Sequence, residues 1–261
     1  YADLLSGRSL KLDPMTLAFG KLDENAIAAD FGGAGFDADD KDGIEALLLA
    51  RPGSPFNLSK LEYRELEALA SGSASGWTLN EQTVGAVNGA LAGLLYRRYR
   101  DYRRDGLDGI APYARGNGQQ VLPGELLRLA VPPDSILADE FPDFARALLT
   151  YPRHSEELES RFYWVKQYIA GERNLALMHC LFLPGDDFAG VAMRWYYIGR
   201  GTDAAQVLVG LARQDDATLM ITAEQLASPQ LTGVFAGRRR RRTHSNLDAV
   251  TARLFEALRN H

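Results

Sequence analysis

The chain has 261 residues, of which 46% are hydrophobic and 24% are charged, a balance typical of a folded globular protein rather than of a disordered chain. The net charge of −5 argues against nucleic acid as a partner, because an acidic surface repels a polyanion. A single cysteine, Cys180, excludes an internal disulfide, and no apolar stretch reaches the roughly 20 residues of a membrane-spanning helix. The chain begins at Tyr1 without a methionine, so a preceding segment was cleaved, trimmed or is not included in the sequence, and we expect a periplasmic or secreted location rather than a cytoplasmic one.

The N-terminal part of the chain predicts loops and short helices. A strand is expected over Met15 to Leu22, bounded by turn-forming residues on both sides. Helices are expected over about Asp42 to Arg51 and Ser59 to Ala70, since Ser59 is a good N-cap and leucines then recur on one helical face.

The middle of the chain is predicted to be helical. Asn80 can cap a long helix that Gly106 ends. The first half of this helix carries apolar residues at helical spacing and is expected to be buried, whereas the second half has only tyrosine and charge and is interpreted as a solvated end. Prolines delimit two shorter helices, near Gly124 to Ala130 and Phe141 to Leu149.

The C-terminal part predicts a sheet and a final helix. Five strands are expected: Phe162 to Ile169, Leu175 to Leu183, Gly190 to Ile198, Ala205 to Arg213 and Ala217 to Ala223. Their short connections favour an antiparallel meander, because parallel pairing needs long crossovers. Ser245 can cap a last helix, and its apolar stripe is expected to pack on the sheet.

These elements predict a single α+β domain over residues 1–261. A loop-rich and helical layer spans 1–76, a helical segment spans 77–160, and an antiparallel sheet with a C-terminal helix spans 161–261. The expected architecture is therefore a helical N-terminal half packed with a sheet that the terminal helix closes, as in a helix grip.

The common catalytic and metal-binding motifs are absent from the sequence. There is no glycine-rich phosphate loop, no Gly-x-Ser-x-Gly elbow and no His-Glu-x-x-His pair. The acidic run from Asp37 to Gly43 departs from a calcium loop because Lys41 takes a ligand position, so it is interpreted as a solvated turn. The histidines occur singly, and neither a metal site nor a cofactor is predicted.

His179 is the most informative polar residue, because strand alternation places it on the same face as leucines 175, 177, 181 and 183. A buried imidazole is unfavourable unless it has a partner. His179 is interpreted either as a core histidine bonded to a backbone carbonyl or a tyrosine, or as a polar fixture in a ligand cavity. In an enzyme, His179 would be the general acid or base, and Tyr196 or Tyr197 would donate a hydrogen bond to an oxyanion.

Other candidate residues also have two interpretations each, and for Arg194 and Trp164 the first is the commoner one. Arg194 either stacks on neighbouring aromatic rings at the sheet surface or binds a carboxylate or phosphate, and Trp164 is either a core residue or a ligand platform. A run of five arginines forms either a solvated turn or a patch that contacts an anionic surface. These arginines are Arg238, Arg239, Arg240, Arg241 and Arg242.

Four short motifs carry a resemblance: Tyr163-Trp164-x-Lys166, His179, Tyr197 followed by Asp203-Ala204, and Leu231-Thr-Gly233. Over about Arg97 to Asn260 they are similar to a family of bacterial conserved proteins without an assigned activity. The family pattern implies a histidine shortly after the strand of Tyr197, where this chain has Arg200. The order of elements resembles the helix-grip arrangement of START-like lipid-binding domains, which implies an apolar cavity between sheet and helices.

The leading functional hypothesis is the binding of a hydrophobic or amphipathic small molecule. This molecule would be lipid-like, and a carboxylate group is one option for its polar end. Its candidate ligand-binding residues are Trp164, His179, Arg194 and Tyr197. The alternatives are an enzyme that uses His179 and a tyrosine in the same cavity, and a non-catalytic interaction protein with a filled core. The sequence leaves the oligomeric state open.

Overall fold

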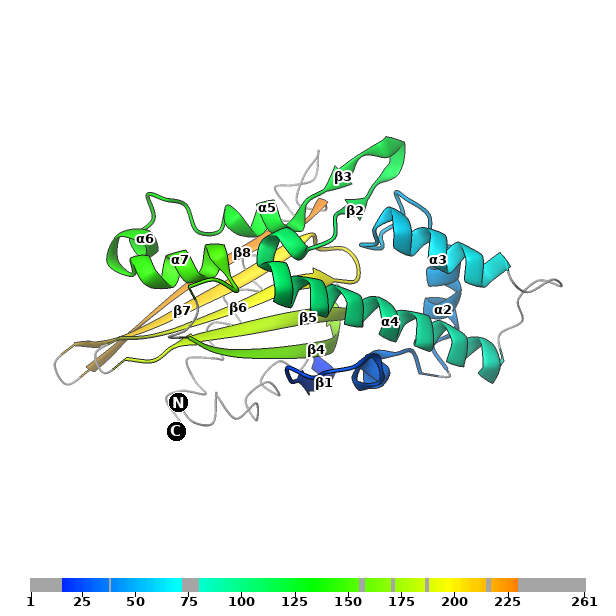
Figure 1. The fold of residues 1–261 in the computed structure, drawn as a ribbon, viewed down its shortest axis with the longest axis horizontal. Coiled ribbons are helices and arrows are strands. Elements are labelled where there is room, and N and C mark those ends of the chain that lie inside the picture. The colour runs from blue at the N-terminus through cyan, green and yellow to red at the C-terminus, as the bar shows by residue number, and fades with distance from the viewer. Residues whose placement is uncertain are drawn as a thin grey trace.

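The computed structural model describes residues 16–37, 39–71, 80–154, 158–169, 172–185, 188–214 and 217–229. The fold is α+β, with several helices and a six-stranded antiparallel sheet (Figure 1). The expected helix after Ser245, the Leu231-Thr-Gly233 motif and the run from Arg238 to Arg242 lie outside the described residues.

The sheet is an open meander in the order β1-β4-β5-β6-β7-β8. Its strands are β1 (Thr16–Leu22), β4 (Glu159–Ile169), β5 (Glu172–Leu183), β6 (Phe188–Ile198), β7 (Ala204–Gln214) and β8 (Ala217–Ala227). The five predicted C-terminal strands are confirmed, and all five extend beyond their expected ranges because backbone pairing continues past them. The predicted N-terminal strand becomes β1, which pairs with β4.

Helices and short turns make up the rest of the described chain. The helices are η2 (Ala28–Ala34), α2 (Lys41–Leu48), α3 (Lys60–Ser71), α4 (Glu81–Asp105), η3 (Gly106–Gly109), η4 (Gly116–Gly118), α5 (Pro123–Arg128), α6 (Ile136–Glu140) and α7 (Pro142–Thr150). A small hairpin joins β2 (Tyr113–Ala114) to β3 (Gln120–Val121). The sequence did not predict this hairpin, η2 or α6. Among the described helices, none is long and apolar enough to cross a membrane.

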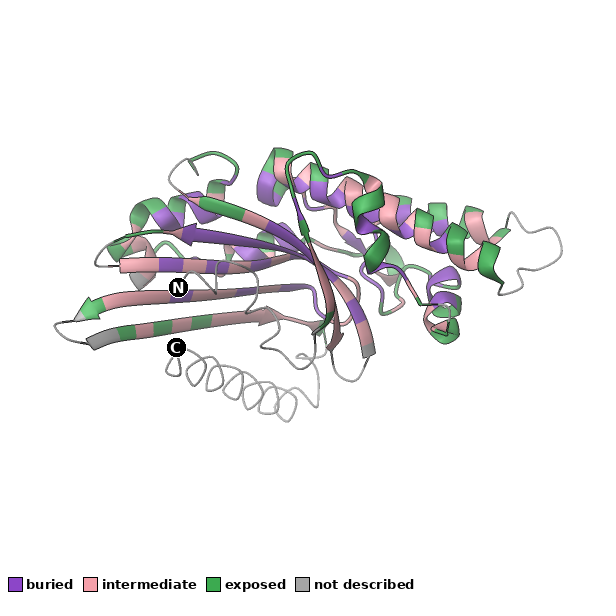
Figure 2. Ribbon diagram, turned by 90° about the horizontal axis from the view of Figure 1, so that it is seen from below, coloured by how far each residue is buried: buried purple, intermediate pink, exposed green. Residues whose placement is uncertain are grey.

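Helix α4 runs from the end of the molecule that contains α2 and α3 to the middle of the sheet (Figure 1). It begins beside α2 and α3, and its last turns lie over the sheet (Figure 1). The Asn80 side chain accepts a hydrogen bond from the backbone nitrogen of Thr83 at 2.8 Å, which confirms the predicted cap. Figure 2 shows buried residues along the inner side of this helix and across the central strands.

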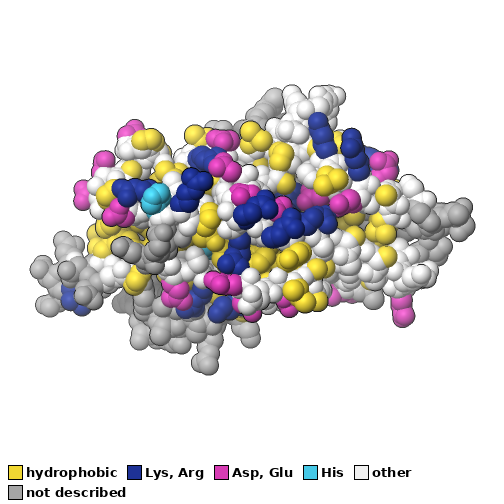
Figure 3. Space-filling model, in the orientation of Figure 1, with side chains coloured by type: hydrophobic (Ala, Val, Ile, Leu, Met, Phe, Trp, Pro, Cys, Tyr) yellow, Lys and Arg dark blue, Asp and Glu magenta, His cyan; other side chains and the backbone are white. Residues whose placement is uncertain are grey.

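The interpretation of the second half of α4 as a solvated end was wrong. Arg98, Tyr99 and Tyr102 are buried, because one side of the helix packs on the sheet and on α3. Only the outer side follows the prediction, with arginines such as Arg100 and Arg104 paired to neighbouring aspartates. Figure 3 shows Lys and Arg side chains interspersed with Asp and Glu over this face.

Apolar side chains cover both faces of the central strands. On the helix side, one large hydrophobic cluster draws residues from all three expected segments of the chain. A second cluster lies on the opposite face and contains Tyr163, Val165, Met178, Cys180 and Phe182. Burial on both faces explains why β5 reads as an almost continuous apolar run instead of alternating with polar residues.

Trp164 is a core residue held in place by two glycines. Its indole nitrogen donates a hydrogen bond to the Asp30 carbonyl oxygen at 3.1 Å. A side chain at Gly20 would overlap the indole ring, and one at Gly33 would lie 2.8 Å from its Cζ2 atom. The absence of both side chains therefore positions the ring between β1 and η2.

We expect Gly20→Ala to lower the free energy of unfolding by about 1–3 kcal/mol, because the added methyl group forces the Trp164 ring to move in a packed core. Urea denaturation measures the change. The matched control is Gly32→Ala, whose added methyl group would have no atom within 4 Å. Equal losses in the two variants would contradict the packing role of Gly20.

Candidate functional site

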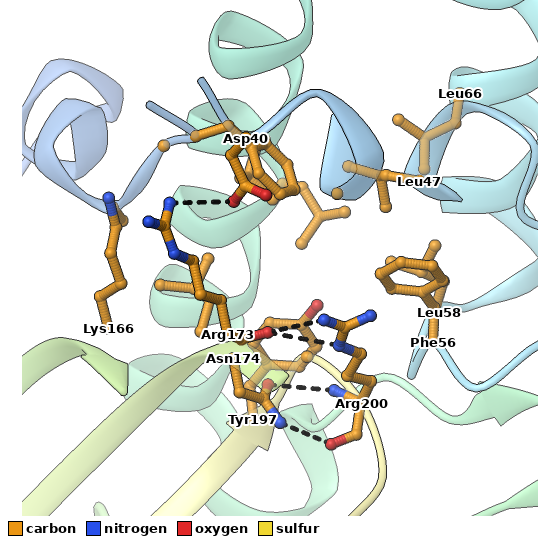
Figure 4. Close-up of a pocket in the computed structure, with 18 residues that line it drawn as sticks. Asp40, Leu47, Phe56, Leu58, Leu66, Lys166, Arg173, Asn174, Tyr197 and Arg200 are labelled. Atoms are coloured by element: carbon orange, nitrogen blue, oxygen red, sulfur yellow. Dashed lines mark hydrogen bonds and ion pairs between the residues drawn. The ribbon is translucent and has the colours of Figure 1, made fainter. Parts of the chain in front are cut away.

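A pocket opens where the ends of β4, β5 and β6 meet α2, α3 and α4 (Figure 4). Its empty volume is about 740 Å³, part of which is open solvent at the mouth. The apolar walls come from several elements and include Leu47, Phe56, Leu58, Leu66, Leu91 and Leu94. These side chains are almost fully buried, so the walls belong to the main hydrophobic cluster of the fold.

Charged side chains line the mouth of this pocket. Arg173 extends toward Asp40, and its Nη1 atom lies 3.4 Å from Asp40 Oδ2 and 3.3 Å from Asp37 Oδ2 (Figure 4). Lys166 Nζ lies 3.5 Å from the same Asp37 oxygen. A hydrogen bond with Tyr168, together with the charge of Asp40, raises the pKa of Arg173 above its ordinary value. The mouth is therefore a cluster of cations with carboxylates already beside them.

Arg200 fixes the backbone of the neighbouring strand at the same mouth. Its Nη2 and Nε atoms lie 3.0 Å and 3.3 Å from the Arg173 carbonyl oxygen, to which both donate. The Asn174 side chain donates to the Arg200 carbonyl oxygen and accepts from the Arg200 backbone nitrogen. The Arg200 guanidinium also lies 5.6 Å from the centre of the Phe56 ring. These contacts hold the start of β5 against the end of β6.

Tyr197 lines the pocket and rests on a buried ion pair. The Arg98 guanidinium lies 4.4 Å from the centre of the Tyr197 ring. Arg98 Nε and Nη2 donate to the two carboxylate oxygens of Glu62 at 2.8 and 2.6 Å. Burial alone would raise the pKa of Glu62, but the charge and hydrogen bonds of Arg98 hold that pKa below its ordinary value. Both partners are thus charged beneath the pocket.

His179 lies away from the pocket, in the core on the helix side of the sheet. Its Nδ1 atom is 3.0 Å from the Tyr102 hydroxyl oxygen, and its Nε2 atom is 3.0 Å from Ser160 Oγ. Its ring stacks on Phe162 at a centroid distance of 4.2 Å. Burial and the nearby charge of Arg194 hold the pKa of His179 well below 6.5. These contacts are those expected of a neutral core histidine with a tyrosine partner.

Arg194 is also buried, which corrects the expectation that it stacks at the sheet surface. Its long side chain reaches an amide oxygen of β7 and a backbone oxygen of α7. Nε donates to Gln206 Oε1 and Nη2 donates to the Leu148 carbonyl oxygen, both at 2.8 Å. Nη1 lies 3.4 Å from the Tyr102 hydroxyl oxygen. These three partners are an amide, a backbone carbonyl and a hydroxyl, and none of them is a carboxylate.

Hydrogen-bond donors and acceptors along this cluster can be assigned in order. Tyr102 accepts from Arg194, and among the described residues His179 Nδ1 is the only acceptor within hydrogen-bond distance of its hydroxyl. The Tyr102 proton is therefore assigned to that contact, which leaves the proton of the neutral imidazole on Nε2. His179 then donates to Ser160 Oγ and has no free lone pair with which to take a proton from that hydroxyl. Arg194 also opposes formation of an imidazolium. This arrangement disfavours His179 as a general base.

The structure separates the residues that the sequence grouped into one site. Tyr197 lines the pocket, whereas Trp164, His179 and Arg194 are not among its lining residues. Tyr196 points elsewhere as well, with its ring stacked at 4.1 Å on Tyr102. An irregularity in the pairing of β5 with β6 lies beside Tyr196 and Tyr197, which lets both neighbours be buried.

The tyrosine that is hydrogen-bonded to His179 is Tyr102 of α4, a residue that the sequence analysis did not single out. Sequence reasoning also missed the cationic mouth. Lys166 and Arg200 entered only through the motif resemblance, and Arg173 was passed over. The available signal was that all three cations lie at strand ends that an antiparallel meander brings to one edge of the sheet.

No protein-family model, no curated protein and no solved structure matches the chain. Among the described residues, no group of three or more His, Cys, Asp or Glu side chains is placed to hold a metal ion. The predicted cavity between the sheet and the C-terminal helix involves a segment outside the described residues. The candidate site is therefore the pocket at the end of the sheet.

Proposed function

We propose that the protein binds a small amphipathic carboxylate in the pocket at the end of the sheet. The observation that carries this proposal is the combination of apolar walls with a mouth formed by Lys166, Arg173 and Arg200. Ligand pockets are commonly apolar with a few polar groups that fix the orientation of the ligand. The apolar part of the ligand would lie among the leucines, and its carboxylate would lie at the mouth.

The chemistry of the mouth favours an anionic head group. Guanidinium groups bind carboxylates through a planar fork of donors, and two of the three cations are arginines. Asp37 and Asp40 support this preference, because carboxylates already lie beside Arg173 and Lys166. Part of the 740 Å³ volume lies in open solvent, so the enclosed part suits a short apolar group better than a long acyl chain.

We expect octanoate to bind the protein, and Arg173→Gln to weaken its affinity about 10-fold or more, because a charge-assisted contact to the carboxylate is lost. Isothermal titration calorimetry at low salt measures both affinities. The matched control is Arg146→Gln, which removes an exposed arginine on α7 that also pairs with an aspartate. The proposal is wrong if the wild-type protein does not bind octanoate, or if both variants bind it equally.

The apolar walls make a separate prediction. Along the series butanoate, pentanoate and hexanoate, affinity is expected to rise about 4-fold for each added CH₂ group that enters the walls. The gain should stop at the chain length that fills the enclosed volume. Calorimetric titration of the series locates that length, and a series without any gain would show that the carboxylates bind outside the apolar walls.

A further inference from the structure

Two carboxylates of the chain already lie beside the cations that the proposed ligand needs. We infer that Asp37 and Asp40 are built-in competitors, which the carboxylate of the ligand displaces from Arg173 and Lys166. This inference rests on the proposed function and adds the step that selects the ligand. A neutral amphiphile could enter the apolar walls but could not exchange with an aspartate.

The geometry of the resident ion pairs leaves room for a better partner. Both aspartates approach the same atom, Arg173 Nη1, at 3.3 and 3.4 Å, so neither makes the two parallel contacts of a bidentate pair. The Asp37 side chain is 59% exposed, which lets water compete for it. A free carboxylate that approaches the fork of Arg173 face-on would replace two poorly aligned contacts with a bidentate one.

Asp40 has an alternative position within its own helix. It is the N-cap residue of α2, where an aspartate normally accepts a hydrogen bond from the first turn, yet its side chain makes no such bond. Its carboxylate faces Arg173 instead. Asp40 Oδ1 already lies close to Gly43, the third residue of α2, where a side chain would come within 2.7 Å of it. Once displaced, Asp40 can turn over this glycine and cap the helix, which offsets the loss of its ion pair.

The segment that carries the two aspartates follows Phe36, whose backbone is bonded to a side chain of α4. The Phe36 backbone nitrogen and carbonyl oxygen bond to the Asn88 side chain at 2.8 and 3.0 Å. Asp37 and Asp40 follow this anchor and precede α2, so their side chains can move without disturbing either end. The exchange therefore needs side-chain rotation rather than refolding of the pocket.

The test compares octanoate with 1-octanol on the wild-type protein and on the double variant Asp37→Asn/Asp40→Asn, by calorimetry at low salt. We expect the double variant to bind octanoate about 3- to 10-fold tighter, since each partly exposed ion pair that no longer competes is worth a few-fold in affinity. The affinity for 1-octanol should be the same in both proteins. Asp143→Asn, which breaks an Arg146 pair on α7, should behave like the wild type toward both.

The outcomes separate the inference from the proposed function. Octanoate binding by the wild type with unchanged or weaker binding by the double variant would overturn the competitor role and leave the proposed function standing. Binding by the double variant alone would overturn both, because the aspartates of the wild type would then block the site instead of being displaced from it. Absence of binding to both folded proteins, with thermal melts confirming the fold, would overturn the proposed function and the inference with it.

Discussion

Replacing Glu62 by Ala is expected to lower the free energy of unfolding by about 3–5 kcal/mol, because it leaves the buried guanidinium of Arg98 without its counter-charge. The two side chains are only 3% and 6% exposed, so water cannot replace the lost carboxylate. Arg98 also lies over Tyr197, and we expect the pocket wall to be disturbed in the fraction that still folds. Urea denaturation with a fitted m-value gives the stability change.

A second ion pair joins the same two helices and provides the control. Glu65 of α3 pairs with Arg97 of α4, but these side chains are 43% and 37% exposed. Glu65→Ala is expected to change the unfolding free energy by less than about 1 kcal/mol, because water solvates the remaining charge. If the Glu62 and Glu65 variants lost equal stability, burial would not be what makes the Glu62–Arg98 pair important.

The sheet was predictable because the residue patterns that specify its strands and turns are local in the sequence. Each strand is a continuous run of β-forming residues, and the short turns between runs leave antiparallel neighbours as the economical arrangement. The cap at Asn80 is local in the same sense, since its partner is Thr83. Such features depend on residues a few positions apart, which one sequence displays directly.

The second half of α4 was not predictable for the opposite reason. In a stretch of tyrosine and arginine, the sequence alone does not show which side chains are buried, because that depends on their partners. The partner of Arg98 is Glu62, 36 residues away. With that carboxylate in place, Arg98 becomes a core residue. Without it, the same residues indicate a solvated helix, as the sequence analysis concluded.

The candidate site illustrates a similar limit. Lys166, Arg173 and Arg200 lie in different strands or at their ends, and their convergence depends on the register of β4 with β5 and of β5 with β6. Trp164, His179 and Arg194 were prominent in the sequence because polar or large residues stand out in apolar strands. These three residues are polar or large because each makes specific contacts in the core. Which residues line the pocket depends instead on their position along the sheet.

The stability of the wild-type protein, measured against that of a His179→Gln variant, is expected to fall by about 1–2 kcal/mol between pH 6.5 and pH 5. The folded-state pKa of His179 is held well below 6.5 by burial, Arg194 and Arg103. Between those two pKa values the unfolded chain carries a proton on this residue and the folded protein does not. Unfolding therefore takes up a proton, so acid favours the unfolded state, while stability above pH 6.5 is unaffected by this group.

At pH 7.5 the Gln variant should itself be about 1–3 kcal/mol less stable than the wild type, because an amide cannot satisfy both Tyr102 and Ser160 in the same geometry. The difference in unfolding free energy between the wild type and the variant should then decrease as the pH falls, since the variant has no group to protonate at this position. Urea titrations at pH 7.5 and pH 5 measure this difference in unfolding free energy. His154→Gln, a change at an exposed histidine beside Thr150, should leave the stability at pH 7.5 within about 1 kcal/mol of the wild type. A gap between the wild type and His179→Gln that stays constant from pH 7.5 to pH 5 would show that the folded protein protonates His179 as readily as the unfolded chain does. In that case the chain of hydrogen bonds from Arg194 through Tyr102 would not hold the imidazole neutral, and the argument against a proton-accepting role for His179 would fail with it.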